Sequence, residues 1–169
     1  MEKSGMAYTH LRPNQFMQNF LGFAPSIARQ GVFYAPMKDA RTSLVDVRDI
    51  AAVAAAVLTG AGHEGKTYVI TGPESLSYAQ IAEKLAAVLG RKVEYVDVTP
   101  EQAKSGMTAS GMPEWLADAI NELYGPWSRG AGEVTTNVVR EVAGKQAISF
   151  DQFARDHVAA FQGDSSAGA

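Results

Sequence analysis

The amino-acid sequence predicts an α/β fold, because short apolar strands alternate along the chain with amphipathic helices. The segments VFYA (residues 32–35) and KTYVIT (residues 66–71) are rich in β-branched and aromatic residues, which favour strands. Between them, apolar residues recur at helical spacing and form one stripe: Ile50, Val53, Ala54, Val57 and Leu58. A chain of 169 residues is long enough for one domain with a substantial hydrophobic core.

Proline residues help to place the N-terminal elements. MAYTHLR (residues 6–12) predicts a strand that ends at Pro13, and Asn14 is placed to cap a helix through NQFMQNFL. Pro25 is expected to break or kink the next part of the chain, because proline removes a helical hydrogen bond. After the strand VFYA, the segment TSLVDV (residues 42–47) predicts a further short strand.

Capping residues mark the ends of the two central helices. Asp46 or Asp49 can satisfy the first free amides of the helix that carries the apolar stripe, and Gly60 ends it. Ser77, with Gln80 three residues later, is a capping-box pattern that opens the second helix. Both helices are therefore predicted with defined starts.

The C-terminal part of the chain is predicted to be mainly helical. An alternating strand, KVEYVDV (residues 92–98), precedes it, and helical patterns run from Pro100 to a final helix that begins at Ser149. Residues 1–162 are expected to form a single domain, and the polar tail of residues 163–169 is expected to be disordered.

Composition limits the classes of function. A net charge of −3 gives no electrostatic reason to expect nucleic acid or an anionic membrane as a partner. The chain has no cysteine, and its three histidines lie far apart in the sequence, so no metal site is predicted. The most apolar stretch, residues 50–58, is too short to span a bilayer. We expect a soluble, cytoplasmic protein.

The segment GAGHEGKT (residues 60–67) matches two nucleotide-binding patterns, G-x-G-x-x-G and G-x-x-x-x-G-K-[ST]. Both patterns hold phosphate where a strand precedes and a helix comes after, because the phosphate rests against free amides at the helix N-terminus. Here a helix ends at Gly60 and a strand begins near Lys66. The sequence therefore predicts a helix-to-strand connection rather than a phosphate site.

Two further patterns have structural explanations that we prefer. Tyr34 and Lys38 have the Y-x-x-x-K spacing of the catalytic pair of short-chain dehydrogenases, but Pro36 lies between them and disfavours the helical turn that this pair needs. The charged residues of DVRD (residues 46–49) could form a catalytic constellation, whereas a helix cap with a surface ion pair explains the same residues.

Three segments together resemble the C-terminal part of NmrA-like proteins, which are atypical short-chain dehydrogenase/reductase folds. In family order and spacing they are YTHLRPNQFMQNF, SLVDVRDIAAVAAAVL and HEGKTYVITGPESLSYAQIAEKLAAVLGRKVEYVDVTPE. The likeness points to the NAD(P)H:quinone oxidoreductase-like branch. It implies a partial Rossmann-like parallel sheet, with strands at residues 6–12 and 66–71, and a mainly helical C-terminal substrate-side lobe.

The resemblance also implies NAD(P)H as the cofactor and a place for it. In such proteins a glycine-rich turn after the first strand holds the dinucleotide, and that turn and the catalytic segment lie upstream of the part that this chain matches. The loop after the LRP strand can be carried over, and four of its residues would approach the nicotinamide end of the cofactor: Pro13, Asn14, Gln15 and Phe16. The residues that would face the substrate pocket are Phe16, Met17 and Asn19.

Two functions stay open at this point. In the first, the chain is the substrate-side portion of a reductase whose relatives pass hydride from NAD(P)H to quinone-like or small carbonyl acceptors, and the chain alone is weak or inactive. In the second, it is a non-catalytic NmrA-like module that has a redox-sensing or regulatory role or that binds a ligand or partner without turnover. Without upstream strands, the strand at residues 6–12 is expected to keep an open edge. A second copy or a complementary N-terminal fragment would cover this edge, or else the isolated chain would be only marginally stable.

Overall fold

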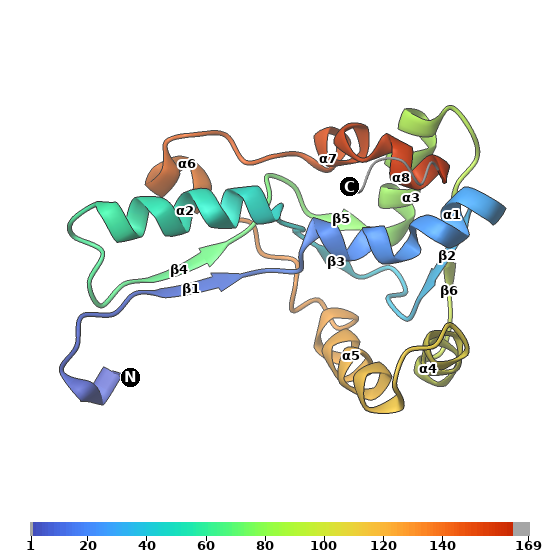
Figure 1. Cartoon of the computed structure of the whole chain (residues 1–169), viewed down its shortest axis with the longest axis horizontal. Coiled ribbons are helices and arrows are strands. Elements are labelled where there is room, and N and C mark those ends of the chain that lie inside the picture. The colour runs from blue at the N-terminus through green and yellow to red at the C-terminus, as the bar shows by residue number, and fades with distance from the viewer. Residues whose placement is uncertain (1, 164–169) are drawn as a thin grey trace.

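Short strands, paired two by two, run through the molecule and are flanked by helices (Figure 1). The computed structural model describes residues 2–163. Its strands form two parallel pairs and one antiparallel pair: β1 (His10–Pro13) with β4 (Thr67–Ile70), β2 (Val32–Ala35) with β6 (Glu94–Asp97), and, antiparallel, β3 (Arg41–Thr42) with β5 (Leu76–Ser77). The predicted parallel pairing of the first strand with the strand in residues 66–71 is confirmed, but β1 is shorter than the predicted strand of residues 6–12: it begins at His10 and includes Pro13.

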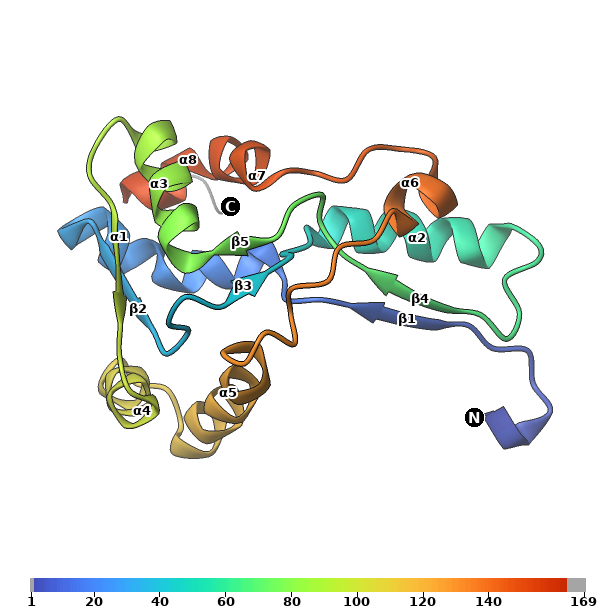
Figure 2. The ribbon, with the colours of Figure 1, turned by 180° about the vertical axis from the view of Figure 1, so that it is seen from behind.

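The helices of the described chain lie in three groups. In chain order these helices are η1 (Glu2–Ser4), η2 (Met17–Phe23), α1 (Ala24–Gln30), α2 (Val47–Thr59), α3 (Tyr78–Leu89), α4 (Pro100–Ala109), α5 (Glu114–Trp127), α6 (Val138–Ala143), α7 (Phe150–Asp156) and α8 (Val158–Gln162). Helix α2 lies along β1 and β4, helices α1, α3, α7 and α8 lie together at the opposite end, and α4 and α5 form a separate pair (Figures 1 and 2). The predicted mixed α/β fold with a mainly helical C-terminal part is confirmed.

One face of the β1–β4 pair is covered by helices α2 and α6. Because side chains alternate between the two faces of a strand, Leu11 and Ile70 pack into a core cluster with Val53 of α2 and Val139 of α6. On the other face, Val69 is 37% exposed. The pair is therefore a half-covered parallel unit, whose helix side is set by the apolar stripe of α2.

A larger core joins η2, β2, α3 and α7 and is rich in aromatic rings. The fully buried ring of Phe20 lies 5.3–5.8 Å, centroid to centroid, from the rings of Phe33, Tyr78 and Phe150. Edge-to-face and tilted contacts of this kind stabilise aromatic pairs beyond the area they bury. This cluster fixes the segment after β1 against the helical end of the molecule.

The predicted caps of the central helices are present. The Asp46 side chain accepts the amide of Arg48 at 2.8 Å and opens α2. Ser77 and Gln80 form the reciprocal capping box of α3, with bonds of 3.2 and 3.0 Å. The final helix, predicted to begin at Ser149, begins one residue later at Phe150, and Ser149 caps it.

Two local predictions near the N-terminus were wrong. Asn14 does not cap a helix: the next helical turn begins at Met17, and the side chain of Asn14 is engaged elsewhere. Pro25 does not break a helix, because it occupies the first turn of α1, where its missing N–H removes no helical bond.

In later parts of the chain, the observed elements also differ in detail from the predicted ones. The strand expected at residues 42–47 is reduced to the two residues of β3, with an isolated bridge at Val45. The final helix is interrupted at His157, which separates α7 from α8. Residues 164–169 of the predicted tail lie outside the described residues, and the single-domain assignment of residues 1–162 stays a prediction. Within the described chain, no helix is long and apolar enough to cross a membrane.

Candidate functional site

The chain leaves β1 at the carboxyl ends of two parallel strands, which is where open α/β sheets bind their ligands. Pro13 pairs with Ile70 at this end, and the Asn14 amide donates to the Ile70 carbonyl at 2.9 Å. The next residues are held by main-chain bonds of 2.9 Å from Val45 to Gln15 and from Met17 to Val45. We call residues 13–19 the β1 loop.

The segment after α5 crosses the ends of these strands (Figure 2). We call residues 132–136 the strap. At its start, the Gly132 carbonyl accepts the amide of Ser43 at 2.9 Å. At its end, Thr136 donates its hydroxyl to the Val69 carbonyl at 2.7 Å and its amide to the Thr71 hydroxyl at 2.9 Å. The strap therefore connects α5 to the ends of the β1–β4 pair.

Asn14 lies between the β1 loop and the strap. Its side-chain nitrogen donates to the hydroxyl of Ser43 and to the carbonyl of Gly132, both at 2.8 Å. Its side-chain oxygen accepts the amide of Gln15 at 2.9 Å. One side chain thus joins three segments of the chain.

Gln15 is the buried polar residue of the β1 loop, with 4% of its surface exposed. Its side-chain nitrogen donates to the hydroxyl of Tyr78 at 2.8 Å, while its Oε1 has no hydrogen-bond partner among the described residues. Burial raises the pKa of Tyr78 well above its ordinary value, and burial raises the pKa of the neighbouring Tyr124 to about 12. The hydrogen bond between Gln15 and Tyr78 links the β1 loop to α3.

The predicted site residues alternate between core and surface. Met17 is 1% exposed and packs into the aromatic core, whereas Phe16 is 37% exposed and Asn19 is also exposed. The structure brings Pro13, Asn14 and Gln15 together at the end of β1 through the contacts above. Phe16 and Asn19 therefore face solvent, whereas Gln15 and Met17 face the core.

Sequence reasoning missed the partners that shape this loop, which are Ser43, Tyr78 and the strap. A glycine gives the one local signal for the strap, because a Cβ built on Gly132 would lie 2.8 Å from Thr42 Oγ1. Only glycine permits this close approach. Ser43 and Tyr78 carry no pattern that marks them, since their contacts depend on the tertiary fold.

Two hollows occur near the strap and the helical pair. One of about 280 Å³ is lined by Pro73, Thr135, Thr136, Asn137, Val139, Arg140, Gln146 and Ala147. The other, of about 530 Å³, lies between α4 and α5. Residues of the β1 loop line neither hollow.

The described residues fit one end of a nicotinamide dinucleotide better than the other. The unpaired Oε1 of Gln15 and the exposed ring of Phe16 suit the nicotinamide end, which offers amide donors and a flat ring. A pyrophosphate needs free amides at a helix start. At α2, α3 and α4 one of those amides is already bonded, to the side chain of Asp46, Ser77 or Thr99 respectively.

The predicted helix-to-strand connection at residues 60–67 is confirmed. Gly60 ends α2, and its amide donates to the Ala56 carbonyl at 2.8 Å. The Gly65 amide is taken by the Tyr8 carbonyl at 2.7 Å. The loop therefore comes after the carbonyl end of a helix, where the partial charge is negative and disfavours an anion.

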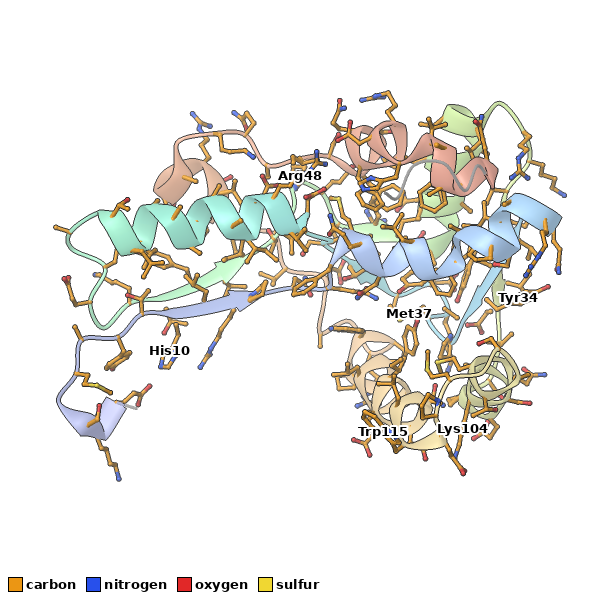
Figure 3. All side chains as sticks on the ribbon, in the orientation of Figure 1. His10, Tyr34, Met37, Arg48, Lys104 and Trp115 are labelled. Carbon is orange, nitrogen blue, oxygen red and sulfur yellow. The ribbon has the colours of Figure 1, made fainter. Side chains whose placement is uncertain are left out.

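The other sequence patterns do not converge on a site. Tyr34 lies on β2 and Lys38 lies in the next loop with a φ of 49°, so the two are not on one helical face. His10 and Tyr34 lie at opposite ends of the molecule (Figure 3). Across residues 2–163, no three His, Asp or Glu side chains cluster in a way that could hold a metal ion.

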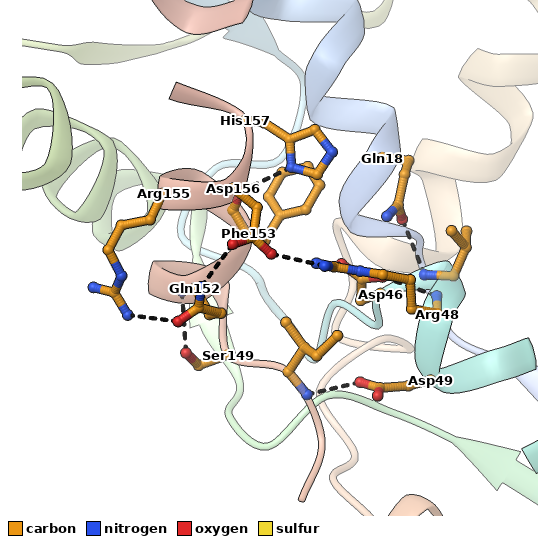
Figure 4. Close-up of polar contacts among 12 residues, drawn as sticks. Gln18, Asp46, Arg48, Asp49, Ser149, Gln152, Phe153, Arg155, Asp156 and His157 are labelled. Carbon is orange, nitrogen blue, oxygen red and sulfur yellow. Dashed lines mark hydrogen bonds and ion pairs between the residues drawn. The ribbon is translucent and has the colours of Figure 1, made fainter. Parts of the chain in front are cut away.

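The charged residues at the start of α2 form a structural link, as preferred from the sequence. Arg48 bonds to Asp46 and to Asp156 of α7, each at 2.8 Å (Figure 4). Burial acts to raise the pKa of Asp46, but the side-chain and main-chain hydrogen bonds from Arg48 outweigh it and lower that pKa. These contacts join α2 to α7.

Comparison with known proteins identifies the family. Residues 1–143 match the model of the NmrA-like family. The chain is 49% identical over 163 residues to the NAD(P)H azoreductase of Xenophilus azovorans, covering 95% of this chain and 56% of that protein. It is 33% identical over 117 residues to quinone oxidoreductase 2 of Escherichia coli, covering 69% of this chain and 41% of that protein.

Solved structures agree with this assignment. The NADPH-dependent quinone oxidoreductase of Escherichia coli superposes with a TM-score of 0.87 at 27% identity, covering 93% of this chain and 57% of that one. The same enzyme has been solved with NADPH, with a TM-score of 0.86. This chain spans about half the length of the curated relatives that it matches. It belongs to the NmrA-like family.

Proposed function

We propose that this chain is the substrate-side part of an NAD(P)H-dependent reductase that passes hydride to quinone-like or other small carbonyl acceptors. The observation that carries the proposal is the β1 loop, which stands at the carboxyl ends of two parallel strands. Relatives named as an NAD(P)H azoreductase and a quinone oxidoreductase support the reaction class. A cytoplasmic location belongs to the same proposal.

Bound NAD(P)H would supply the hydride, and the chain would bind and orient the reactants. Pro13 and Phe16 would offer apolar contact to the nicotinamide end, and Gln15 would accept a hydrogen bond there. The exposed ring of Phe16 and the amide of Asn19 would face the acceptor. Met17 would support the pocket from the core side, since it is buried beneath the loop.

A second candidate is a non-catalytic NmrA-like module with a redox-sensing or regulatory role. One observation favours it: the β1 loop, PNQFMQN, contains no titratable side chain. The loop therefore holds no group that could give a proton to the reduced acceptor. In the reductase, that proton would have to come from solvent or from another part of the protein. Binding of NADPH without turnover would distinguish this module from the reductase.

The discriminating experiment is a titration of the protein with NADPH, monitored by the fluorescence of the cofactor, and then addition of a quinone. We expect binding that Phe16→Ala weakens roughly tenfold, or about 1.4 kcal/mol. Leu58→Ala is the matched control, because Leu58 is apolar and 84% exposed on α2, away from the loop. Absence of binding at millimolar NADPH would contradict the reductase, whereas binding without quinone-dependent oxidation would favour the module.

A further inference from the structure

The amide of Asn14 is fully engaged as a donor within the protein. A primary amide has two N–H donors, and both are used, by the Ser43 hydroxyl and the Gly132 carbonyl at 2.8 Å each. The oxygen accepts the Gln15 amide at 2.9 Å. A cofactor could receive a hydrogen bond from this nitrogen only if one of the existing bonds were broken.

The two acceptors come from distant parts of the sequence. Ser43 is 29 residues from Asn14, and Gly132 is 118 residues away. Ser43 also holds the strap directly: its main-chain amide donates to the same Gly132 carbonyl at 2.9 Å, and its hydroxyl donates to the carbonyls of Gly132 and Val134. The β1 loop, the segment before α2 and the strap therefore meet at a single side chain.

The chemistry of this junction requires an amide at position 14. The Gly132 carbonyl is an acceptor only, so a carboxylate in place of Asn14 would place two hydrogen-bond acceptors next to each other with no donor between them. The Gly132 backbone can approach because it has no Cβ, which would lie 2.8 Å from Thr42 Oγ1. The hydrogen bond between the two residues thus depends on an amide at position 14 and on a glycine at position 132.

We propose that Asn14 is a positioning residue: it holds the strap over the carboxyl ends of β1 and β4 and fixes the β1 loop, and its amide does not contact the cofactor. The consequence for NAD(P)H rests on the function proposed above. The contact between loop and strap is independent of that function. Asn14 should therefore influence NAD(P)H binding through Ser43 and Gly132.

The test compares Asn14→Ala, Ser43→Ala and the double variant in two measurements. Hydrogen exchange of the free protein reports the Ser43 and Thr136 amides, which the strap contacts protect. We expect both amides to exchange at least tenfold faster in Asn14→Ala, and to a smaller degree in Ser43→Ala. NADPH affinity should fall in the same order, and the loss in the double variant should be smaller than the product of the single losses. Since Asn14→Ala could unfold, Asn14→Asp is the second variant: it keeps the oxygen that accepts the Gln15 amide but places a carboxylate against the Gly132 carbonyl, so it should also speed exchange.

Asn137→Ala is the matched control, because Asn137 is exposed beside the strap and its side chain caps no helix. It should leave exchange and affinity unchanged. The proposal is overturned if Asn14→Ala weakens NADPH binding while exchange stays as in the wild type and Ser43→Ala has no effect, since Asn14 would then be a direct ligand. If the wild type does not bind NADPH, the proposed function fails, and exchange alone decides the role of Asn14.

Discussion

The carboxylate of Asp49 on α2 accepts the main-chain amide of Ile148 at 2.7 Å, and this bond joins α2 to the segment that leads into α7. Asp49 is fully buried, and its other oxygen lies 2.7 Å from the Lys145 ammonium. We predict that Asp49→Ala lowers the free energy of unfolding by about 1–3 kcal/mol, because the buried amide loses its acceptor. Urea denaturation measures the change.

One variant serves as the control for this prediction. Asp39→Ala removes an exposed carboxylate and should change stability by less than about 0.5 kcal/mol. Equal effects of Asp49→Ala and Asp39→Ala would show that the Ile148 contact contributes little.

The ion pairs of Arg48 make stability depend on acid pH. Hydrogen bonds from Gln152 and Arg48 lower the pKa of Asp156, as Arg48 lowers that of Asp46. The unfolded chain therefore takes up these protons first, so the stabilisation is present above the ordinary pKa of 3.8 and is lost as pH falls through the folded-state values. We predict that Arg48→Met lowers the melting temperature at neutral pH and flattens its decline below about pH 4.

Thermal melts across this pH range measure the effect. Arg155→Met is the control, because Arg155 contacts only the Gln152 side chain at 3.3 Å within the described structure. Its melting curve should keep the acid dependence of the wild type. If the melting temperature of Arg48→Met fell with pH as steeply as that of the wild type, these ion pairs would not be the source of the acid dependence.

The glycine-rich connection should not take part in cofactor binding. We predict that Lys66→Ala leaves NADPH affinity within about twofold of the wild type, because the loop comes after the carbonyl end of α2. Phe16→Ala, measured in the same titration, shows that the assay responds. A tenfold loss with Lys66→Ala would place a phosphate at this loop and contradict its role as a plain connection.

The open edge of β1 should make the isolated chain associate. Among the described strands, β1 pairs with β4 alone, and Val69 is exposed on the uncovered face of the pair. Unpaired edges with apolar surface favour further pairing. We predict a mass above that of the monomer in light scattering after size-exclusion chromatography, reduced by Val69→Lys. A thermally robust wild-type monomer would contradict this expectation.

Local signals in the sequence predicted much of the fold. Helix caps act over two or three residues, so the sequence predicted Ser77 as the cap of α3 and Asp46 or Asp49 as the cap of α2, of which the structure selects Asp46. Pro25 shows the limit of such signals, because proline ends one helix or begins another according to a context that the pattern does not contain.

The candidate site depends on distant contacts, and these could not be predicted. The neighbouring residues predict that Asn14 caps a helix, yet the acceptors of its side-chain nitrogen lie 29 and 118 residues away in the sequence. The family resemblance named the β1 loop as a whole, whereas the tertiary packing decides that Gln15 and Met17 turn inward and Phe16 turns outward. Periodicity over such a short, irregular loop carries no information on these directions.

The two ends of the strap are anchored beside different strands, with only three residues between Gly132 and Thr136. An insertion or deletion at residues 133–135 would pull one anchor away from its acceptor. Among the described contacts, the connection between α4 and α5 has no such tether at both ends. In homologous chains, length variation should therefore accumulate between these helices and be rare in the strap.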